Sequence, residues 1–534
     1  MDLSEAKAPI KPSPSPNRGV RFWAIIGTLC LLSFVSTIDV AVITTSLPSI
    51  TKSLGSQKQQ YVWLANSFPL ASTVFQPLYG QLADVFGRRN PLIISIVLFT
   101  LGSGLAGGAN DVSMHIAGRV VQGIGAGALY VYCEIVCCDL VPLRERGKYL
   151  GFIFSFAGVA AALGPVVGGA LTESNWRWIF YLNIPICAAA LVAVLVFMRV
   201  KSGQASSQRP SVYNKLSQVD WIGNLIFTTS MTALLYGAVT GGIEHPWSDY
   251  RVVLPIVFGC LGWVAFHVHQ RYVRNPSVPP RLFGNRTSAI CFFLTFSASV
   301  LVQIPAYFLA IYFQAVQTMT VLQSGINFLP MAIGTLAFGV VGGVILSKFG
   351  AYRPFHALAF GLSSLGFALF TLLDANSGPV TWVCVQLLVA AESGILLATI
   401  LPAIMAALSE SDVAAATAVY LFVRCFGYIW GITIPSVIFN DLVNKNLDKI
   451  SDPAMRLNLI DGGAYGFASR VHSLKDILSR EALAEIKSVY FASLKPLWWV
   501  AFSLSCVTYV SVWFERQLEL RQELETDYGL DDDE

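Results

Sequence analysis

The stretch GQLADVFGRRNP at residues 80–91 returns in altered form as GVILSKFGAYRP at residues 343–354. Glycine, phenylalanine, glycine and proline recur at matching places, and the offset between the two copies is 263 residues. Each copy separates two long apolar segments. A parallel repeat of this kind predicts two like halves, each a bundle of six helices.

The composition excludes most soluble proteins. Of 534 residues, 54% are hydrophobic and 13% are charged, whereas a soluble domain carries about 25% charged residues. The net charge of +3 is small, and no basic run suits a phosphate backbone. We therefore expect a lipid bilayer, and not nucleic acid, around most of this surface.

Apolar segments long enough to cross a bilayer, about 20 residues each, recur along the chain. The sequence predicts an all-α integral membrane protein with six-helix bundles at 22–198 and 288–513 and two inserted helices at 219–270. The fourteen predicted spans are 22–44, 61–80, 91–109, 113–134, 149–171, 178–198, 219–240, 252–270, 288–314, 325–346, 355–374, 379–405, 412–439 and 496–513.

The basic residues orient these spans. If residues 1–21 form a cytosolic tail, the inner loops and tails carry 21 of the 35 Lys and Arg residues and the short outer loops carry four. Basic residues concentrate in cytosolic loops. We therefore expect both termini in the cytosol, the long loop 440–495 outside it, and residues 514–534 as a solvated acidic tail.

Four motifs follow one another in the first half. They are DVAVITTSLP at 39–48, GQLADVFGRR at 80–89, RVVQGIGAG at 119–127, and Gly151 followed by GPVVGG at 164–169. In this order the chain resembles the major facilitator superfamily, and within it the fourteen-span drug:proton antiporters such as fungal toxin and multidrug efflux pumps. The resemblance covers residues 21–513. It departs at Ala160, where the fifth-span motif usually has another glycine.

The resemblance implies a major facilitator fold and a proton-coupled exporter of small organic toxins, drugs or secondary metabolites that works by alternating access. Three alternatives stay open: a carrier of basic amino acids, a carrier of iron chelates, and a non-transporting membrane sensor. No serine elbow, HExxH or Walker loop indicates an enzyme. The expected partners are the substrate, protons and lipid, and the protein is expected to act as a monomer in the plasma membrane or, alternatively, the vacuolar membrane.

Polar residues within the first and fourth spans are the first site candidates. At 100° per residue, His115, Arg119, Gln122, Tyr130 and Glu134 share one face of the fourth span. Polar groups in a span are costly unless they face protein or a water-filled cavity, so this face predicts a lining of the transport pathway. In the resembling family this arginine is implicated in proton coupling. The natural partner of Arg119 is Asp39, deep in the first span, which is the candidate proton carrier; packing is the alternative role.

The second half contributes Glu392 in the twelfth predicted span and Arg424 in the thirteenth. These two could bind substrate, bind protons or lock the bundle.

Charged residues at the cytosolic rim form a candidate gating network, whose simpler role is to anchor the topology. They are Asp84, Arg88, Arg89, Asp139 and Arg146.

The antiporter motif, Gly164, Pro165, Gly168 and Gly169, is read as a place where helices approach closely and one helix bends.

The ten cysteines lie within apolar segments, away from histidines at metal-ligand spacing. We therefore expect no metal site, no disulfide framework and no cofactor.

Overall fold

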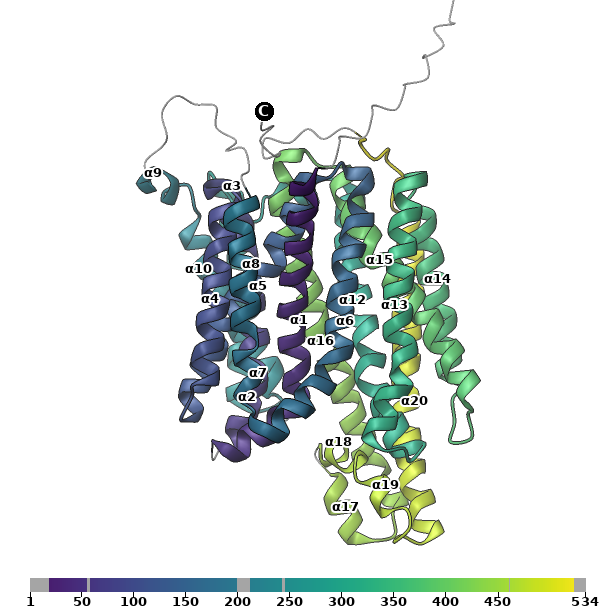
Figure 1. Ribbon diagram of the computed structural model, residues 1–534. Coiled ribbons are helices and arrows are strands. Elements are labelled where there is room, and N and C mark those ends of the chain that lie inside the picture. The colour runs from purple at the N-terminus through teal and green to yellow at the C-terminus, as the bar shows by residue number, and fades with distance from the viewer. Residues whose placement is uncertain (1–18, 55–57, 199–211, 243–244, 461, 523–534) are drawn as a thin grey trace, which may run out of the picture.

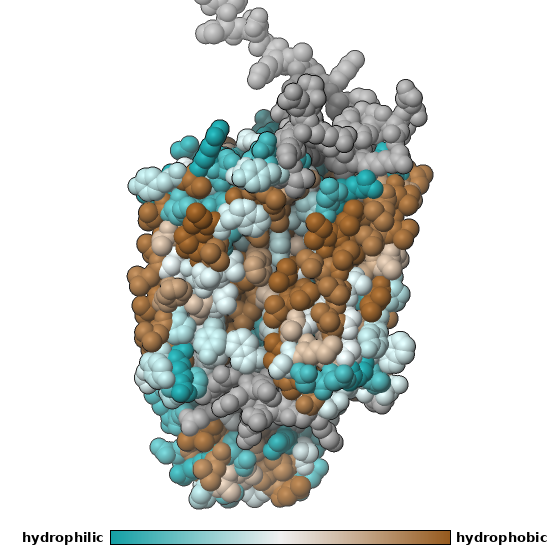
Figure 2. Space-filling model, turned by 90° about the vertical axis from the view of Figure 1, so that its left-hand side faces the viewer, coloured by the Kyte–Doolittle hydropathy of each residue, from teal (hydrophilic) through white to brown (hydrophobic). Residues whose placement is uncertain are grey.

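The computed structural model describes residues 19–54, 58–198, 212–242, 245–460 and 462–522. These residues form helices and no strand, and one isolated bridge joins Gly241 and His245. Eleven helical stretches in the described part are long and apolar enough to cross a membrane. The fourteen spans predicted are therefore not all recovered by length and hydropathy. The chain is a multi-pass membrane protein, and Figure 2 shows hydrophobic side chains over the middle of one face with hydrophilic ones toward both ends.

The described residues of the first half form eight helices. They are α1 (Val20–Ser53), α2 (Lys58–Val74), α3 (Gln76–Phe86), α4 (Arg89–Gly107), α5 (Val112–Leu140), α6 (Leu143–Asn175), α7 (Trp178–Tyr181) and α8 (Asn183–Phe197). One predicted span, 61–80, is divided between α2 and α3 at Phe75. Pro77, which has no N–H to donate, lies in the first turn of α3, where that loss costs little.

The second half follows a short α9 (Val212–Leu216) and a helix pair. The pair is α10 (Trp221–Thr240) and α11 (Tyr250–Tyr272); the half itself has α12 (Arg286–Ile311), α13 (Val321–Phe349), α14 (Arg353–Phe370), α15 (Pro379–Ala406), α16 (Val413–Asn446) and α20 (Arg480–Val512). Short helices α17 (Pro453–Leu459), α18 (Gly463–Ala468) and α19 (Val471–Leu474) lie between α16 and α20 and project from one end of the molecule (Figure 1). That end is called the α17–α19 end, and the opposite one, with residues 80–91, the motif end.

Helix pairing is alike in the two halves. α1 packs on α6, α2 and α4 pack on α5, and α4 packs on α8. In the second half α12 packs on α16, α13 and α14 pack on α15, and α14 packs on α20. Contacts between the halves correspond as well, because α6 packs on α13 and α16 packs on α3. This is the arrangement that two copies of one unit, related by a pseudo-twofold axis, would produce.

The backbone conformation explains why glycine recurs at residues 87 and 350 of the repeated sequence. Gly87 follows α3 with φ of 80°, and Gly350 follows α13 with φ of 69°. Positive φ is costly for residues with a Cβ. Both copies therefore end a helix at the motif end with a glycine at positive φ, although ψ differs between Gly87 (178°) and Gly350 (4°).

The helix pair α10–α11 lies at one side of the molecule, against α2 and α16 (Figure 1). Large apolar residues of α11, among them Leu254, Phe258 and Leu261, are exposed. Gln81 of α3 binds the start of α10, because its Oε1 accepts hydrogen bonds from the Asp220 amide and the Asn224 side chain, each at 3.1 Å. The pair thus packs beside α2 of the first half and α16 of the second.

Candidate functional site

A buried ion pair joins the first and fifth helices. Arg119 Nη1 of α5 lies 2.6 Å from Asp39 Oδ2 of α1, and the two side chains are 1% and 0% exposed. Arg119 Nη1 also donates to Gln122 Oε1 at 2.6 Å, and its guanidinium carbon lies 4.2 Å from the centre of the Phe68 ring. Asp39, Arg119 and Gln122, all candidates from the sequence, are therefore brought together at one place.

The carboxylate of Asp39 accepts from three donors. Besides Arg119, Gln122 Nε2 and Asn183 Nδ2 each donate to Oδ1 at 2.8 Å. Ser103 of α4 closes the network, because its Oγ accepts from Gln122 Nε2 at 2.8 Å. Such donors stabilise a charged carboxylate, and removing one member of a buried pair typically costs about 3–5 kcal/mol. Sequence reasoning missed Asn183 and Ser103, which stand as single polar residues in apolar runs.

Glycines let the helices of this site approach closely. A Cβ added at Gly123 would lie 2.6 Å from the Phe68 carbonyl oxygen of α2, and one at Gly118 would lie 2.6 Å from the Ala106 nitrogen of α4. Small residues allow this packing of helices in membranes. The motif at 119–127, with Gly118 directly before it, thus supplies both the arginine and the close packing around it.

His115 departs from the expected pathway lining. It is fully buried, with its ring 5.2 Å from that of Phe180 and 5.7 Å from that of Trp176. Its Nδ1 lies 3.1 Å from the Ala106 carbonyl oxygen. The periodicity placed it on the face of Arg119, and in the structure the rings of Trp176 and Phe180 pack against it.

A second buried pair connects the two halves. Arg424 Nη2 of α16 lies 3.2 Å from Glu134 Oε1 of α5, and the side chains are 14% and 3% exposed. The Arg424 guanidinium lies 5.4 Å from the Phe154 ring and 5.3 Å from the Tyr420 ring. Glu134 Oε2 and Arg424 Nε have no hydrogen-bond partner among the described residues. The sequence marked both residues as candidates but did not pair them.

Glu392 is separate from these pairs. It is fully buried in α15, and its Oε2 accepts a hydrogen bond from Ser393 Oγ at 3.2 Å. Its Oε1 has no partner in the described part of the chain. The structure therefore does not join Glu392 to Arg424, the other candidate from the second half.

The charges at the motif end form two groups. In the first, Arg88 Nε lies 2.7 Å from Asp139 and Nη1 lies 3.2 Å from Asp84, so α3 is joined to α5. Arg89 belongs to neither group, because its Nη2 donates to the Leu195 carbonyl oxygen at 2.7 Å.

The second group crosses between the halves. Arg146 of α6 is fully buried and lies 2.8 Å from Glu410, and Arg521 lies 3.2 Å from the same carboxylate. Arg144 donates to the Ser347 carbonyl oxygen at 2.9 Å. The sequence identified Arg146 but missed Glu410, whose partner is 264 residues away. These contacts hold the halves together at the motif end.

The antiporter motif brings α6 against α1. A Cβ added at Gly164 would meet the side chain of Ala41. The Gly168 carbonyl oxygen accepts from Thr172 Oγ1 at 2.6 Å, whereas a Cβ at Gly169 would meet nothing within 4 Å. Pro165 lies within α6, and its side chain is outside the described part. Close approach therefore depends on Gly164.

The expected solvated tail at 514–534 is wrong for its first residues. Glu515 is 1% exposed and Leu520 is 2% exposed. Tyr352 of the second half donates to the Arg516 carbonyl oxygen at 2.6 Å, and the Arg144 amide donates to the Arg521 carbonyl oxygen at 3.1 Å. Polar side chains of the bundle bind this segment, which the acidic composition of the tail did not reveal. Residues 523–534 lie outside the described part.

Known proteins match this sequence over most of its length. The profile of the Major Facilitator Superfamily matches residues 29–432. The MFS efflux transporter aclA of Aspergillus oryzae is 44% identical over 520 residues, covering 97% of this chain and 93% of its own. The efflux pump FUS6 of Gibberella moniliformis is 40% identical over 524 residues, covering 97% and 92%.

Two solved structures share the fold. The human organic anion transporter MFSD10 has a TM-score of 0.57 at 14% identity, covering 92% of this chain and 100% of its own. The proton:xylose symporter XylE has a TM-score of 0.54 at 14% identity, covering 93% and 98%.

Proposed function

The chain belongs to the major facilitator superfamily, and on that premise we propose that it is a proton-coupled exporter of small organic toxins, drugs or secondary metabolites. The observation that carries the proposal is the Asp39 carboxylate, buried in the apolar part of the chain and hydrogen-bonded to Arg119, Gln122 and Asn183. A carboxylate there must either stay paired or take up a proton. Relatives named as efflux pumps support export.

The proposed topology has fourteen spans with both termini in the cytosol. Eleven candidate spans stand on length and hydropathy. We add α2–α3, α14 and the second part of α20, because each pairs with neighbouring helices as its counterpart in the other half does. The motif end is then cytosolic and the α17–α19 end is extracytosolic. A tag inserted in 453–474 should be reached from outside intact cells, and a tag reached only after permeabilisation would overturn this topology.

Alternating access requires that contacts between the halves break at one end while they form at the other. In this structure they include Arg146 with Glu410 and Arg144 with Ser347, both at the motif end. The Glu134–Arg424 pair lies deeper and also joins the halves. We propose that the structure represents a state closed toward the cytosol, and that both sets of contacts break when the transporter turns inward.

Roles for the individual residues follow. We propose that Asp39 carries the proton and that Arg119 and Gln122 hold its carboxylate between exchanges. The cytosolic gate would consist of Asp84, Arg88, Asp139 and Arg146. The Gly164 contact between α6 and α1 would limit leakage during the turn. Glu134, Arg424 and Glu392 are candidates for substrate or proton contacts.

Export can be tested in cells. Cells that express the chain should accumulate less of some amphiphilic toxin from a panel than cells without it, and a protonophore should abolish the difference. Greater accumulation of basic amino acids or iron chelates would favour the carrier alternative instead. Movement of no compound, with normal protein at the membrane, would favour a sensor. The same cells identify the membrane, which we propose to be the plasma membrane.

A further inference from the structure

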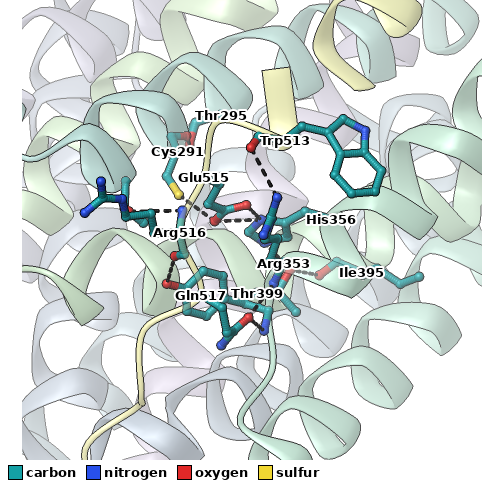
Figure 3. A network of polar contacts seen from close by, with 12 residues as sticks. Cys291, Thr295, Arg353, His356, Ile395, Thr399, Trp513, Glu515, Arg516 and Gln517 are labelled. Carbon is teal, nitrogen blue, oxygen red and sulfur yellow. Dashed lines mark hydrogen bonds and ion pairs between the residues drawn. The ribbon is translucent and has the colours of Figure 1, made fainter. Parts of the chain in front are cut away.

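Three side chains of types that can bind metal ions, from distant parts of the chain, lie together near the motif end. Figure 3 shows them at close range. Cys291 lies in the second turn of α12, His356 in the first turn of α14, and Glu515 just after α20. One ligand atom from each lies within 4.8 Å of the other two, and all three residues are buried. None of them belongs to the transport site described above.

The contacts are short and converge on one carboxylate. Cys291 Sγ donates to Glu515 Oε1 at 3.1 Å. His356 Nδ1 lies 3.0 Å from Glu515 Oε2 and 3.2 Å from Oε1. Figure 3 shows the thiol and the imidazole pointing toward the carboxylate from two sides.

The far side of the imidazole is held by Thr399. The hydroxyl of Thr399 donates to the Ile395 carbonyl oxygen at 2.8 Å, so its oxygen is left to accept a hydrogen bond. His356 Nε2, at 3.1 Å, is therefore the donor. This assignment leaves Nδ1 facing Glu515, where either the imidazole or the carboxylate must hold a proton. A ligating histidine is usually oriented by such a partner on its other nitrogen.

These hydrogen bonds require two protons, one on the Cys291 thiol and one between His356 and Glu515. A divalent cation can replace both: M²⁺ enters, two H⁺ leave, and thiolate, carboxylate and neutral imidazole remain. The net charge of the three protonated side chains is zero. The net charge is also zero when the cation is bound to thiolate, carboxylate and neutral imidazole. The buried site would therefore carry no uncompensated charge after the cation binds.

We propose that Cys291, His356 and Glu515 form a binding site for a divalent transition-metal ion, with Zn²⁺ the best match. Thiolate, imidazole and carboxylate are the ligand types of zinc. Three protein ligands leave one position of a tetrahedron for water.

The site would tie the C-terminal segment to the second half. Tyr352 already holds that segment, because its hydroxyl donates to the Arg516 carbonyl oxygen and accepts from the Leu518 amide at 2.8 Å. Gln517 Oε1 accepts from the Arg353 amide at 3.1 Å. Glu515 is therefore positioned before any metal binds, and bound metal would fasten the segment more firmly.

The test uses the full chain purified in detergent, freed of metal with a chelator and titrated with Zn²⁺. We expect one Zn²⁺ per chain. Affinity should fall at least 100-fold in Cys291→Ser and in His356→Gln, and about 10–100-fold in Thr399→Val, which loses only the orienting contact. Cys30→Ser removes a buried thiol elsewhere and should bind like the wild type.

A second readout uses Co²⁺, whose thiolate complexes absorb strongly in the near ultraviolet. This band should appear in the wild type and in Cys30→Ser, and be missing in Cys291→Ser. Size-exclusion elution and thermal unfolding without metal show which variants fold. The metal affinities of the folded variants then test the proposal. Substoichiometric Zn²⁺ in the wild type, or equal affinity in all the folded variants, would overturn the proposal and leave these residues as a hydrogen-bonded tether.

Discussion

Replacing Arg424 alone in the Glu134–Arg424 pair should destabilise the protein more than replacing both residues together. In Arg424→Met the Glu134 carboxylate would stay buried and Oε1 would lose the cation that lies 3.2 Å away; among the described residues, Oε2 has no hydrogen-bond partner to compensate. Such a loss costs about 3–5 kcal/mol, whereas replacing both partners with neutral residues of similar volume is often close to neutral. We therefore expect Arg424→Met to lower the free energy of unfolding by about 3–5 kcal/mol.

The double variant Glu134→Gln/Arg424→Met should recover most of that loss, to within about 1 kcal/mol of the wild type. The assay is denaturant titration in bicelles, followed by tryptophan fluorescence, for the wild type, both single variants and the double variant. The four values give the coupling free energy of the pair. A coupling below about 0.5 kcal/mol would refute the reasoning, because it would mean that the two groups do not depend on each other.

Two further predictions concern the proposed gate and the antiporter motif. Arg146→Gln removes a charged contact to Glu410 worth about 1.5–3 kcal/mol, so cysteines placed at the motif end should react with a polar thiol reagent at least tenfold faster. The matched control Arg89→Gln, which loses a contact within one half, should react at the wild-type rate, and equal rates in both variants would contradict the gate. Gly164→Val should abolish transport because its side chain meets Ala41; Gly169→Val, which meets nothing within 4 Å, should transport normally, and the converse result would show that Gly164 is not the contact.

The helices were largely predictable because the cost of exposing backbone and charge to lipid leaves a strong signal in the sequence. Their ends were not, since α1 continues past the predicted limit at 44 to Ser53, and α20 begins at Arg480 and not near 496. In both places the helix extends with polar residues beyond the apolar run. Hydropathy marks where lipid surrounds a helix, and not where its hydrogen bonding stops.

Parts of the site were predictable where the residues share one helix, or where a buried charge requires a partner of opposite charge. Asp39 required a partner, and Arg119 is the basic residue that lies inside a predicted span of the first half, so that pair followed from the cost of burying charge. The Glu134–Arg424 pair depends on how the two halves pack, and its members are 290 residues apart. Cys291 and Glu515 are 224 residues apart. No local pattern in the sequence indicates such distant contacts.

The central claim, that Asp39 carries the proton which drives export, is tested most directly in sealed vesicles. Proton movement and substrate movement are measured together for the wild type and for Asp39→Asn, which keeps the shape of the side chain but fixes it as neutral. We predict that Asp39→Asn still binds substrate but loses proton-driven transport, and that Arg119→Lys, without the planar guanidinium, is also impaired. Coupled movement of protons and substrate at the wild-type ratio in Asp39→Asn would contradict the account and direct the search to Glu134 or Glu392.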